Sequence, residues 1–320
     1  MPVRFTSPSL GGQHDSFYKK GEWQISASYR RLLADQWFVG TEIDEAAAPF
    51  GKPLYLDIHS LDLSLTYGFN RRTNVTLTLP FSSGTHSRFY ADNNRHKVSS
   101  RGIGDINLIA NLWLLEPNMH PDGNVALGFG IKPPVGNNRV EDDFFLADGT
   151  ITKRVVDQSI QPGDGGWGFI AQAQLYQRVA SRLNAYASGS YLISPKKKTD
   201  VPSPLAGVTL AVPDVYSVRA GGAYVVSTSR GMSVNVGARI DGIPLRDVVG
   251  GADDGFRRPG HTLYLDPGAA MRVGKQEFTI SVPLRMSQNF SRSLIDRERN
   301  FKGGGDLADY LVFAGYSVRF

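Results

Sequence analysis

The sequence predicts an all-β fold: one antiparallel barrel of about twelve strands that crosses a membrane. Apolar and polar residues alternate along most of the chain, which is the period of a β-strand. The alternating segments are mostly 10–14 residues long, whereas about 5–6 residues are usual in water-soluble proteins and about 9–11 allow a tilted strand to cross a bilayer. Long and short connections also alternate, as in barrels with short turns on one side of the membrane and long loops on the other.

Residues 60–69 show the alternation in its simplest form. Leu61, Leu63, Leu65 and Tyr67 are separated by small or polar residues, so the segment has one apolar and one polar face. The predicted strands are 22–32, 58–69, 73–81, 102–115, 123–133, 165–177, 182–193, 214–227, 232–241, 261–273, 276–289 and 308–320. The connections between them have 25, 3, 20, 7, 31, 4, 20, 4, 19, 2 and 18 residues.

Two folds fit strands with one apolar face. In hydrocarbon only helices and closed barrels satisfy all backbone polar groups, whereas in water a second sheet must cover the apolar face. A large soluble β-sandwich is therefore the alternative, and the alternating connection lengths favour the barrel. The last strand, 308–320, ends on Phe320 and resembles the C-terminal signal of bacterial outer-membrane proteins. We therefore expect a barrel of the outer-membrane type, located in the outer membrane of a Gram-negative bacterium.

Composition limits the other classes of protein. Residues 22–320 are expected to form the barrel, and residues 1–21 a periplasmic tail or small plug. Because Met1–Gly21 has no cationic start followed by an apolar stretch, we expect the chain to be a mature form without its signal peptide. The absence of Cys excludes a disulfide scaffold and a thiol nucleophile. A net charge of +5 over 320 residues gives no reason to expect nucleic acid as a partner.

The polar faces of the strands predict the lining of the lumen. A cation that faces hydrocarbon at mid-depth costs roughly 2–4 kcal/mol, so charged residues within the strands should point inward. The predicted lining and selectivity residues are Arg30, Asp62, Asp105, Lys132, Arg219, Arg239, Asp241, Asp266, Arg272, Glu277 and Arg285. They would either select a polar or charged solute or form a salt-bridge network that fills a narrow barrel. Twelve strands lie between the filled barrels of eight and the open channels of sixteen.

Aromatic residues on the same polar faces leave a similar choice. Trp113, Tyr176, Tyr186, Tyr264 and Phe313 would form either a track for a ring-containing solute or packing that narrows the pore. Of the two, we expect packing.

The longest connection, 134–164, is expected to be functional because structureless loops of this length are uncommon. It could fold into the lumen as a constriction, with Phe144 and Phe145 as apolar anchors. Its acidic residues match no standard calcium loop, so no metal site is predicted.

The other long loops carry cationic groups that could pair with the phosphates of outer-membrane lipids, including lipopolysaccharide, or could simply keep the loops soluble. These groups are Arg95, His96, Lys97, Lys196, Lys197, Lys198, Arg257, Arg258, Arg297 and Arg299.

A rim hydrolase is the alternative function. The turn at 70–72 pairs residue 69 with 73, and the same register pairs His59 with Ser83 on the outer face. Asp57 lies two residues along on that face. Serine, histidine and a carboxylate are the minimum for acyl transfer, although no oxyanion donor can be named. The main prediction is a non-enzymatic protein without a catalytic site or a cofactor. Gly102-x-Gly104 opens a strand rather than a helix, so it is not a dinucleotide site.

The segment Gly102-Ile103-Gly104-Asp105-Ile106-Asn107-Leu108 resembles a strand opening in outer-membrane barrels of the phenol meta-pathway degradation family. Residues 111–115 and 124–134 are similar to the parts that follow it. The similarity extends over about 57–193 and is vaguer beyond. It implies passive transport of an aromatic or hydrophobic compound, although the charged lining argues against a purely apolar one. We therefore expect an outer-membrane channel for a small solute. A sealed structural or partner-binding barrel is a further alternative.

Overall fold

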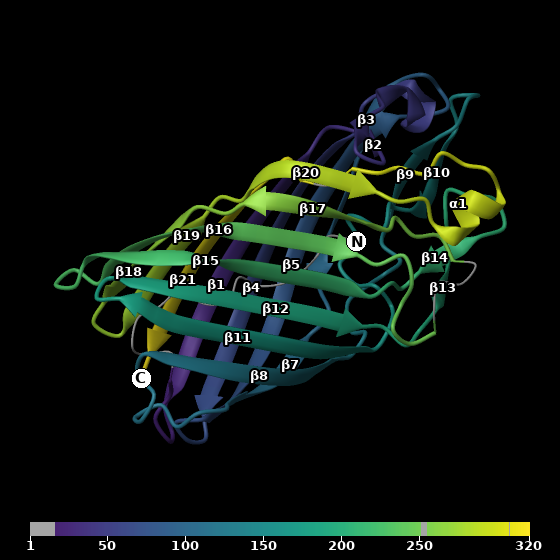
Figure 1. Cartoon of the computed structure of the whole chain (residues 1–320). Helices are drawn as coiled ribbons and strands as arrows, with labels where there is room; N and C mark the ends of the chain where they lie inside the picture. The colour runs from purple at the N-terminus through teal and green to yellow at the C-terminus, as the bar shows by residue number, and fades with distance from the viewer. Residues whose placement is uncertain (1–16, 251–254, 307) are drawn as a thin grey trace.

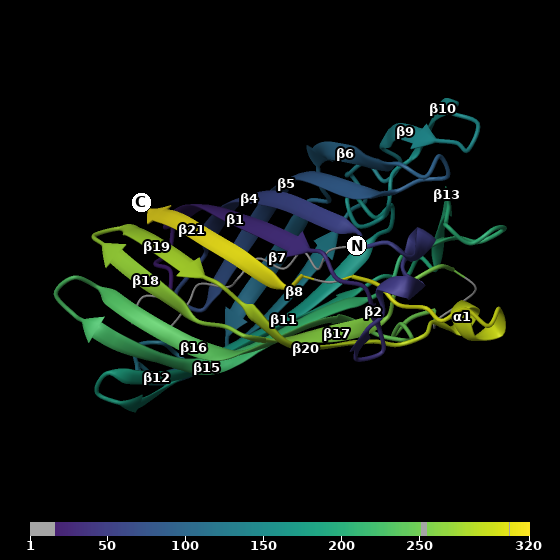
Figure 2. The same cartoon turned by 90° about the horizontal axis from the view of Figure 1, so that it is seen from above.

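The computed structural model describes residues 17–250, 255–306 and 308–320, and these form a closed antiparallel barrel. The strand β1 (Trp23–Ala34) pairs with β4 (Tyr55–Gly68) on one side and with β21 (Tyr310–Arg319) on the other. Figures 1 and 2 show the purple β1 beside the yellow β21, where the two ends of the sheet meet. The prediction of a single twelve-stranded barrel is confirmed.

Twelve strands make the wall, and three of them are interrupted. In order around the barrel they are β1, β4, β5 (Thr73–Phe89), β6 (Arg95–Ile103) with β7 (Asn107–Trp113), β8 (Gly123–Lys132), β11 (Gly168–Ala180), β12 (Leu183–Ile193), β15 (Val215–Ser227), β16 (Met232–Ile243), β17 (Gly260–Leu265) with β18 (Gly268–Val273), β19 (Gln276–Ser281) with β20 (Leu284–Phe290), and β21. Each pairs with its neighbours in the chain, as in an up-and-down barrel.

Proline explains two of the three interruptions. Pro267 separates β17 from β18, and Pro283 separates β19 from β20. A proline has no N–H to donate to the ladder, so it ends regular pairing within a sheet. The carbonyl groups of both prolines still accept hydrogen bonds. The Val282 N–H donates to the Pro267 carbonyl at 3.0 Å, and the Leu311 N–H donates to the Pro283 carbonyl at 3.0 Å. The predicted strands 261–273 and 276–289 are therefore each two shorter strands.

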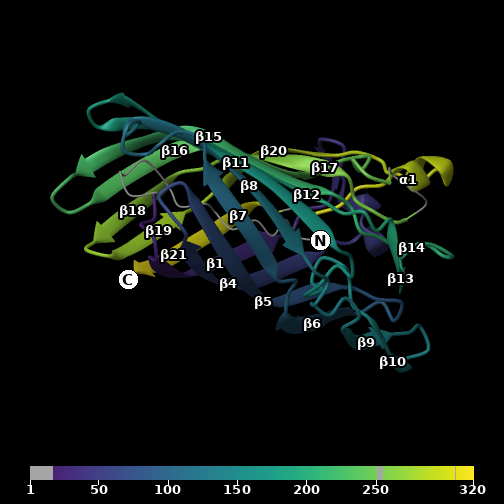
Figure 3. The same cartoon turned by 90° about the horizontal axis from the view of Figure 1, so that it is seen from below.

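The two ends of the barrel differ, as the alternating connections predicted. One end, here called the turn end, carries the short connections 69–72, 181–182, 228–231 and 274–275 together with the C-terminus. The other, the loop end, carries the long ones. Figures 1 and 3 show the small elements of the loops gathered there. They are β2 (Phe38–Val39), β3 (Glu42–Ile43), η1 (Glu45–Ala47), η2 (Pro49–Gly51), β9 (Glu141–Phe145), β10 (Ile151–Val155), β13 (Lys198–Pro202), β14 (Thr209–Ala211) and α1 (Leu294–Glu298). In the described ranges, no helix is both long and apolar enough to span a membrane.

Two predicted strands were too short at the loop end. The prediction 73–81 continues to Phe89, and 102–115 is preceded by the rest of β6 from Arg95. The expected twenty-residue loop is therefore a hairpin that extends the wall beyond the predicted limit. Residues 82–87 carry polar side chains on both faces, so the period-two pattern that marks lipid-facing strands is missing there. The 134–164 connection likewise contains a short hairpin, β9–β10.

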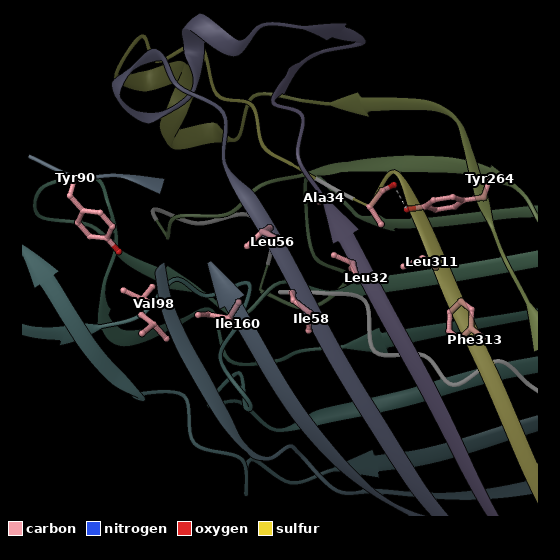
Figure 4. Packing of buried hydrophobic residues seen from close by; sticks show 12 residues of the cluster. Leu32, Ala34, Leu56, Ile58, Tyr90, Val98, Ile160, Tyr264, Leu311 and Phe313 are labelled. Carbon is pink, nitrogen blue, oxygen red and sulfur yellow. Dashed lines mark hydrogen bonds between the residues drawn. The ribbon is translucent and has the colours of Figure 1, made fainter. Parts of the chain in front are cut away.

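The interior contains an apolar cluster near the loop end. Its buried members include Leu32 and Ile58 of neighbouring strands, Leu311 and Phe313 of β21, and Ile160 from the 134–164 loop. Figure 4 shows these side chains together inside the wall. The prediction that apolar side chains face lipid therefore fails in this half of the barrel, because there the apolar residues form an internal core.

Candidate functional site

A cavity of about 320 Å³ lies inside the barrel between the apolar cluster and the turn end. Serine, threonine, asparagine and glutamine form the largest group of residues in its wall, for example Ser28, Thr78 and Gln172. Asn111 belongs to a hydrogen-bonded chain across the lining: Gln172 Nε2 donates to Asn111 Oδ1 at 2.6 Å, and Asn111 Nδ2 donates to Asn74 Oδ1 at 3.1 Å. The inward faces of the strands therefore enclose polar, hydrogen-bonded space.

Two arginines stand side by side in the cavity wall. Arg219 on β15 and Arg239 on β16 are direct cross-strand partners, and both line the cavity. Arg219 pairs with Asp266 at 2.5 Å, and Arg239 Nε donates to Asp241 Oδ2 at 2.8 Å. Each guanidinium therefore has its own buried carboxylate, which offsets the cost of burying the charge.

Each of these guanidinium groups also lies over an inward aromatic ring. The Arg219 guanidinium is 5.1 Å from the ring centre of Tyr186, and that of Arg239 is 4.7 Å from the ring centre of Phe313. Both distances are within the range of a cation–π contact. Tyr186 belongs to β12, next to β15, whereas Phe313 belongs to β21, three strands from β16, so Arg239 reaches over part of the interior.

Lys132 holds both ends of the 134–164 loop at the wall. Its Nζ donates to Asp105 at 3.2 Å, to Asp164 at 2.7 Å and to the Gly166 carbonyl at 2.7 Å. Asp105 also accepts from the backbone N–H groups of Gly136 at 2.9 Å and Asp164 at 3.1 Å. Burial is the main cause that raises the pKa of the Asp164 carboxyl, and Lys132 opposes that shift. One buried ammonium between two carboxylates therefore fixes where the loop leaves and rejoins the barrel.

Between the two ends held by Lys132, the loop turns inward and packs against glycine residues of β5 and β6, which have no side chains. Gly84 of β5 faces the interior, and a Cβ built there would lie 2.8 Å from Cγ2 of Ile160. Ser100 Oγ donates to the Ile160 carbonyl. A Cβ on Gly102 would likewise lie 3.2 Å from Pro162. The glycines leave room for the loop segment 156–164, which packs against the inner face of β5 and β6 near the loop end; its role as a constriction stays a prediction. The predicted anchors Phe144 and Phe145, on β9, pack against the apolar cluster described above.

The first described residues narrow the turn end. The Phe17 ring lies 4.9 Å from the ring of Trp113, and Tyr18 lines the cavity. Arg319 Nη1 donates to the Phe17 carbonyl at 3.1 Å, and the Tyr18 hydroxyl donates to Gln24 at 3.0 Å. Residues 1–16 of the predicted tail or plug lie outside the described residues. The cavity therefore has side chains across both of its ends.

The predicted lining residues fall into four groups. Asp62, Asp105, Lys132, Arg219, Arg239 and Glu277 line the cavity. Arg30, Asp241 and Asp266 are buried beside it, and Arg30 donates to Ser60 Oγ at 3.2 Å. Arg272 pairs with Glu277 at 3.5 Å. Arg285 is the one of the eleven that sits away from this region. It pairs with Asp309 at the loop end and lies over the Phe38 ring.

The inward aromatic residues are part of the packing of the interior. Trp113 and Phe313 line the cavity, while Tyr186 and Tyr264 are buried beside it. The Tyr176 ring lies 6.1 Å from that of Phe17. These rings do not form one continuous track, because Tyr264 and Phe313 belong to the apolar cluster and Tyr176 lies at the turn end.

Two of the cationic loop residues turn inward instead of toward lipid. Arg257 is 2% exposed and makes two hydrogen bonds to Asp247, at 2.7 and 2.5 Å. Arg258 pairs with Asp296 at 3.5 Å and lies over the Phe256 ring. Here the positive charges hold the long loops together.

The rim His59 has a different set of partners from those that a hydrolase requires. The predicted register is confirmed, because His59 pairs with Ser83 across β4 and β5. However, His59 Nδ1 lies 2.7 Å from the Tyr29 hydroxyl, and Nε2 lies 3.3 Å from Asp57 Oδ1. In the neutral tautomer that satisfies both contacts, Nε2 donates to Asp57 and the Nδ1 lone pair accepts from Tyr29. The lone pair that would take a proton from Ser83 is thus occupied.

Sequence reasoning missed two residues that hold the site together. Asp164 is one of the acidic residues of the 134–164 loop, for which no individual role was predicted, yet its side chain is 1% exposed. Ile160 was not singled out, although it is an apolar residue in a strongly polar stretch and is 2% exposed. An isolated apolar residue in a long loop is a signal that could have identified the inward segment.

Comparison with known proteins places the fold. No family model matches the chain, and no curated protein matches it. Among solved structures, an outer membrane channel from Pseudomonas putida F1 has a TM-score of 0.66 and 16% identity, covering 97% of this chain and 100% of that one. The translocator domain of the autotransporter NalP from Neisseria meningitidis has a TM-score of 0.48 and 12% identity, covering 96% and 91%. A Pseudomonas aeruginosa FadL homologue has a TM-score of 0.46 and 10% identity, covering 94% and 90%. The chain thus has the fold of an outer-membrane β-barrel.

Proposed function

We propose that this barrel is a passive outer-membrane channel for a small solute, with the loop end outside the cell. The cavity inside its wall carries the proposal. At about 320 Å³ it is close to the lower end of the range for small-molecule sites, which is about 300–1,000 Å³. The P. putida structure of the same fold is described as an outer membrane channel, which supports the proposal by analogy. The narrower resemblance to the phenol meta-pathway family stays a prediction.

The character of the interior favours an amphipathic solute with an aromatic or apolar part. Toward the loop end the interior is apolar, with Leu32, Ile58 and Phe313 in one cluster. Toward the turn end it is more polar, because the cavity is lined by amides, hydroxyls and charged groups together with a few apolar side chains such as Ile109 and Leu192. A molecule that passes both regions must suit both. A purely apolar compound would leave the polar lining without partners, which costs free energy.

The charges of the lining are balanced. Among the predicted residues on the cavity, Asp62, Asp105 and Glu277 are acidic, and Lys132, Arg219 and Arg239 are basic; Arg319 at the turn end adds one further base. The three bases all have buried or half-buried carboxylate partners. We therefore propose that selectivity depends on the local arrangement of charge, with only a weak overall preference for anions or cations.

The loop segment 156–164 is the proposed aperture. Its contacts with Gly84, Ser100 and Lys132 hold it across the loop-end side of the interior. Passage requires this segment to move, because the apolar cluster packs around Ile160.

A sealed structural barrel is the second candidate, and one observation favours it. Phe17 and Tyr18 lie at the turn end and the apolar cluster lies toward the loop end, so the cavity is covered on both sides. A barrel of this kind would scaffold the loops for a partner and conduct nothing.

Single-channel conductance in planar bilayers separates the two candidates. In the test variant, two glycines replace residues 138–162; the ends can be joined because the Gly163 N–H donates to the Asn137 carbonyl at 3.0 Å. In the matched control, two glycines replace only residues 141–155, which removes the β9–β10 hairpin and keeps Ile160. This junction is equally close, because the Val156 N–H donates to the Val140 carbonyl at 2.9 Å.

The channel proposal expects larger, salt-dependent current steps from the test variant than from the wild type or the control. Heat-modifiable migration on gels would verify that all three barrels are folded. Silence from a folded test variant would contradict the channel and support the sealed barrel.

A further inference from the structure

The outer wall of the barrel carries a row of polar residues at one level. Arg31 on β1 pairs with His59 on β4, His59 pairs with Ser83 on β5, and Ser83 pairs with Arg101 on β6. Direct cross-strand partners point to the same face of a sheet. Ser83 and Arg101 are exposed, and Arg31 and His59 are half-exposed, so this row, here called the rim row, faces outward.

The levels on either side of the rim row differ sharply in polarity. Two residues closer to the turn end on each strand, the same outer face is apolar. Its residues there are Tyr29, Leu61, Phe81 and Ile103. Two residues closer to the loop end, Leu33 on β1 is followed around the wall by three polar residues, Asp57, Thr85 and Ser99. Arginine facing hydrocarbon is costly, by roughly 2–4 kcal/mol at mid-depth and about 0–1 near the interface. The rim row therefore marks where hydrocarbon gives way to lipid headgroups.

The chemistry of the rim row suits phosphate. Arginine presents N–H donors in a fork that matches phosphate oxygens. Arg31 is held in place by two hydrogen bonds to Asp57, at 3.0 and 2.9 Å, and keeps 40% of its side-chain surface exposed. Arg101 is exposed, and Lys97 extends the positive charge toward the loop end. These three cations outnumber the two nearby carboxylates, Asp57 and Asp142, the second of which accepts from the Ser99 N–H at 2.8 Å, so this part of the wall stays positive.

The spacing fits a headgroup with more than one phosphate. Neighbouring strands are about 4.7–4.9 Å apart, so three strand steps place the Arg31 and Arg101 backbones about 14 Å apart. Their side chains cannot readily share one phosphate. They could each bind one end of a larger headgroup, with the Ser83 hydroxyl as a hydrogen-bonding group between them.

We propose that the rim row binds the headgroup of an outer-leaflet glycolipid that carries a phosphate at each end of a disaccharide. The occupant is assigned from charge complementarity and from the position of the row directly above the apolar level. The inference concerns the outside of the barrel and does not depend on conduction through the lumen. It also gives His59 and Asp57 a role in positioning: Asp57 orients Arg31, and His59 bridges Asp57 and Tyr29.

Lipid retention measured by native mass spectrometry tests this proposal. The protein would be reconstituted in phosphatidylcholine nanodiscs that contain bis-phosphorylated lipid A, or monophosphoryl lipid A, and released into detergent. The variants are Arg101→Gln and the double variant Arg31→Gln/Arg101→Gln. Arg182→Gln is the matched control, because Arg182 is an exposed arginine in the short turn at the opposite end.

We expect the wild type and Arg182→Gln to retain bis-phosphorylated lipid A, the single variant to bind it at least fivefold more weakly, and the double variant to lose it. Monophosphoryl lipid A should bind the wild type more weakly than the bis-phosphorylated form. Equal retention by all variants would overturn the proposal. Displacement of the lipid by millimolar inorganic phosphate would also overturn it, since that result indicates a simple anion site.

Discussion

Arg219 of β15 and Arg239 of β16 are directly opposed cross-strand neighbours in the interior of the barrel. Like charges in this position destabilise a sheet, and both side chains are almost fully buried, at 3% and 2% exposure. Separate carboxylates compensate them, Asp266 for the first and Asp241 for the second. The two guanidinium groups thus stand side by side at one point of the cavity wall, each balanced by its own buried carboxylate.

Removing the charge of one of these arginines should alter the ion preference of the pore without changing its size much. In the variant that lacks residues 138–162, Arg239→Gln should move the reversal potential in a KCl gradient toward cations. Asp62→Asn, also on the cavity, should move it toward anions. The opposite signs come from removing opposite charges along one ion path. If both variants keep the parent reversal potential, the ions do not pass these residues.

Lys132 should be the most sensitive single residue for the stability of the barrel. Lys132→Met leaves Asp105 and Asp164 buried without their shared cation, and breaking a buried pair in this way costs about 3–5 kcal/mol. Guanidinium unfolding in detergent micelles would measure the change in the free energy of unfolding. Lys153→Met is the matched control: Lys153 pairs with Asp143 at 2.7 Å but is 62% exposed, so its loss should cost about 0–1 kcal/mol.

The carboxylates themselves supply a second check on that cost. Replacing Asp105 and Asp164 by Asn in the Lys132→Met background removes the uncompensated charge, and it should recover part of the lost stability. A Lys132→Met protein as stable as Lys153→Met would show that the cluster contributes little.

Asp309, which precedes β21, should make stability depend on mildly acidic pH. Burial raises the pKa of its carboxyl to about 6 from the ordinary value of 3.8. The folded protein therefore retains the proton after the unfolded chain has released it, and the free energy of unfolding should fall as the pH rises from about 4 to 6. The decrease should be modest, since the side chain is 23% exposed and faces Arg285.

The variant Asp309→Asn cannot titrate at this position, so its stability should fall less over the same pH interval. Thermal unfolding of both proteins between pH 4 and 7 would measure the two slopes. Parallel curves would contradict the assignment. The comparison rests on slopes, because the variant also loses the ion pair with Arg285 at all pH values.

The lipid-facing part of the barrel was predictable because two simple constraints act on it. Hydrocarbon on one side and a polar interior on the other impose strict alternation, and this allowed the β4–β5 register to be derived residue by residue. The same reasoning failed in the part of the strands nearer the loop end. Along β4, apolar residues occupy Leu61, Leu63 and Leu65, then shift phase to Ile58 and Leu56. The strand has no bulge in its pairing with β5, so this shift exchanges the polarity of its two faces.

That phase shift is visible in the sequence, but most of it lies outside the predicted strand, which began at residue 58, whereas β4 begins at Tyr55. It marks both the level of the rim row outside and the beginning of the apolar cluster inside. The path of the 134–164 loop was less accessible, because it depends on long-range contacts such as Lys132 with Asp164 and Ile160 with Gly84. Alternation within a strand contains no information about such contacts. The position of this loop segment against the inner wall therefore required the three-dimensional structure.

Gly84 offers a direct test of whether the loop controls the aperture. A side chain at this position would collide with Ile160, because even a Cβ would lie 2.8 Å from its Cγ2 atom. Gly84→Val should therefore displace the segment around Ile160 and increase single-channel conductance. Gly189→Val is the matched control in β12, since a Cβ there meets Val218 at 3.6 Å, an ordinary contact.

The double variant Gly84→Val/Ile160→Gly makes the argument specific. Valine would then occupy the volume that the isoleucine side chain has left, so the loop can return to the wall and conductance should fall again. Recovery of this kind follows from steric complementarity at one contact. If Gly84→Val conducts as the wild type does, or if the double variant conducts as strongly as Gly84→Val, the contact between Gly84 and Ile160 does not hold the aperture closed.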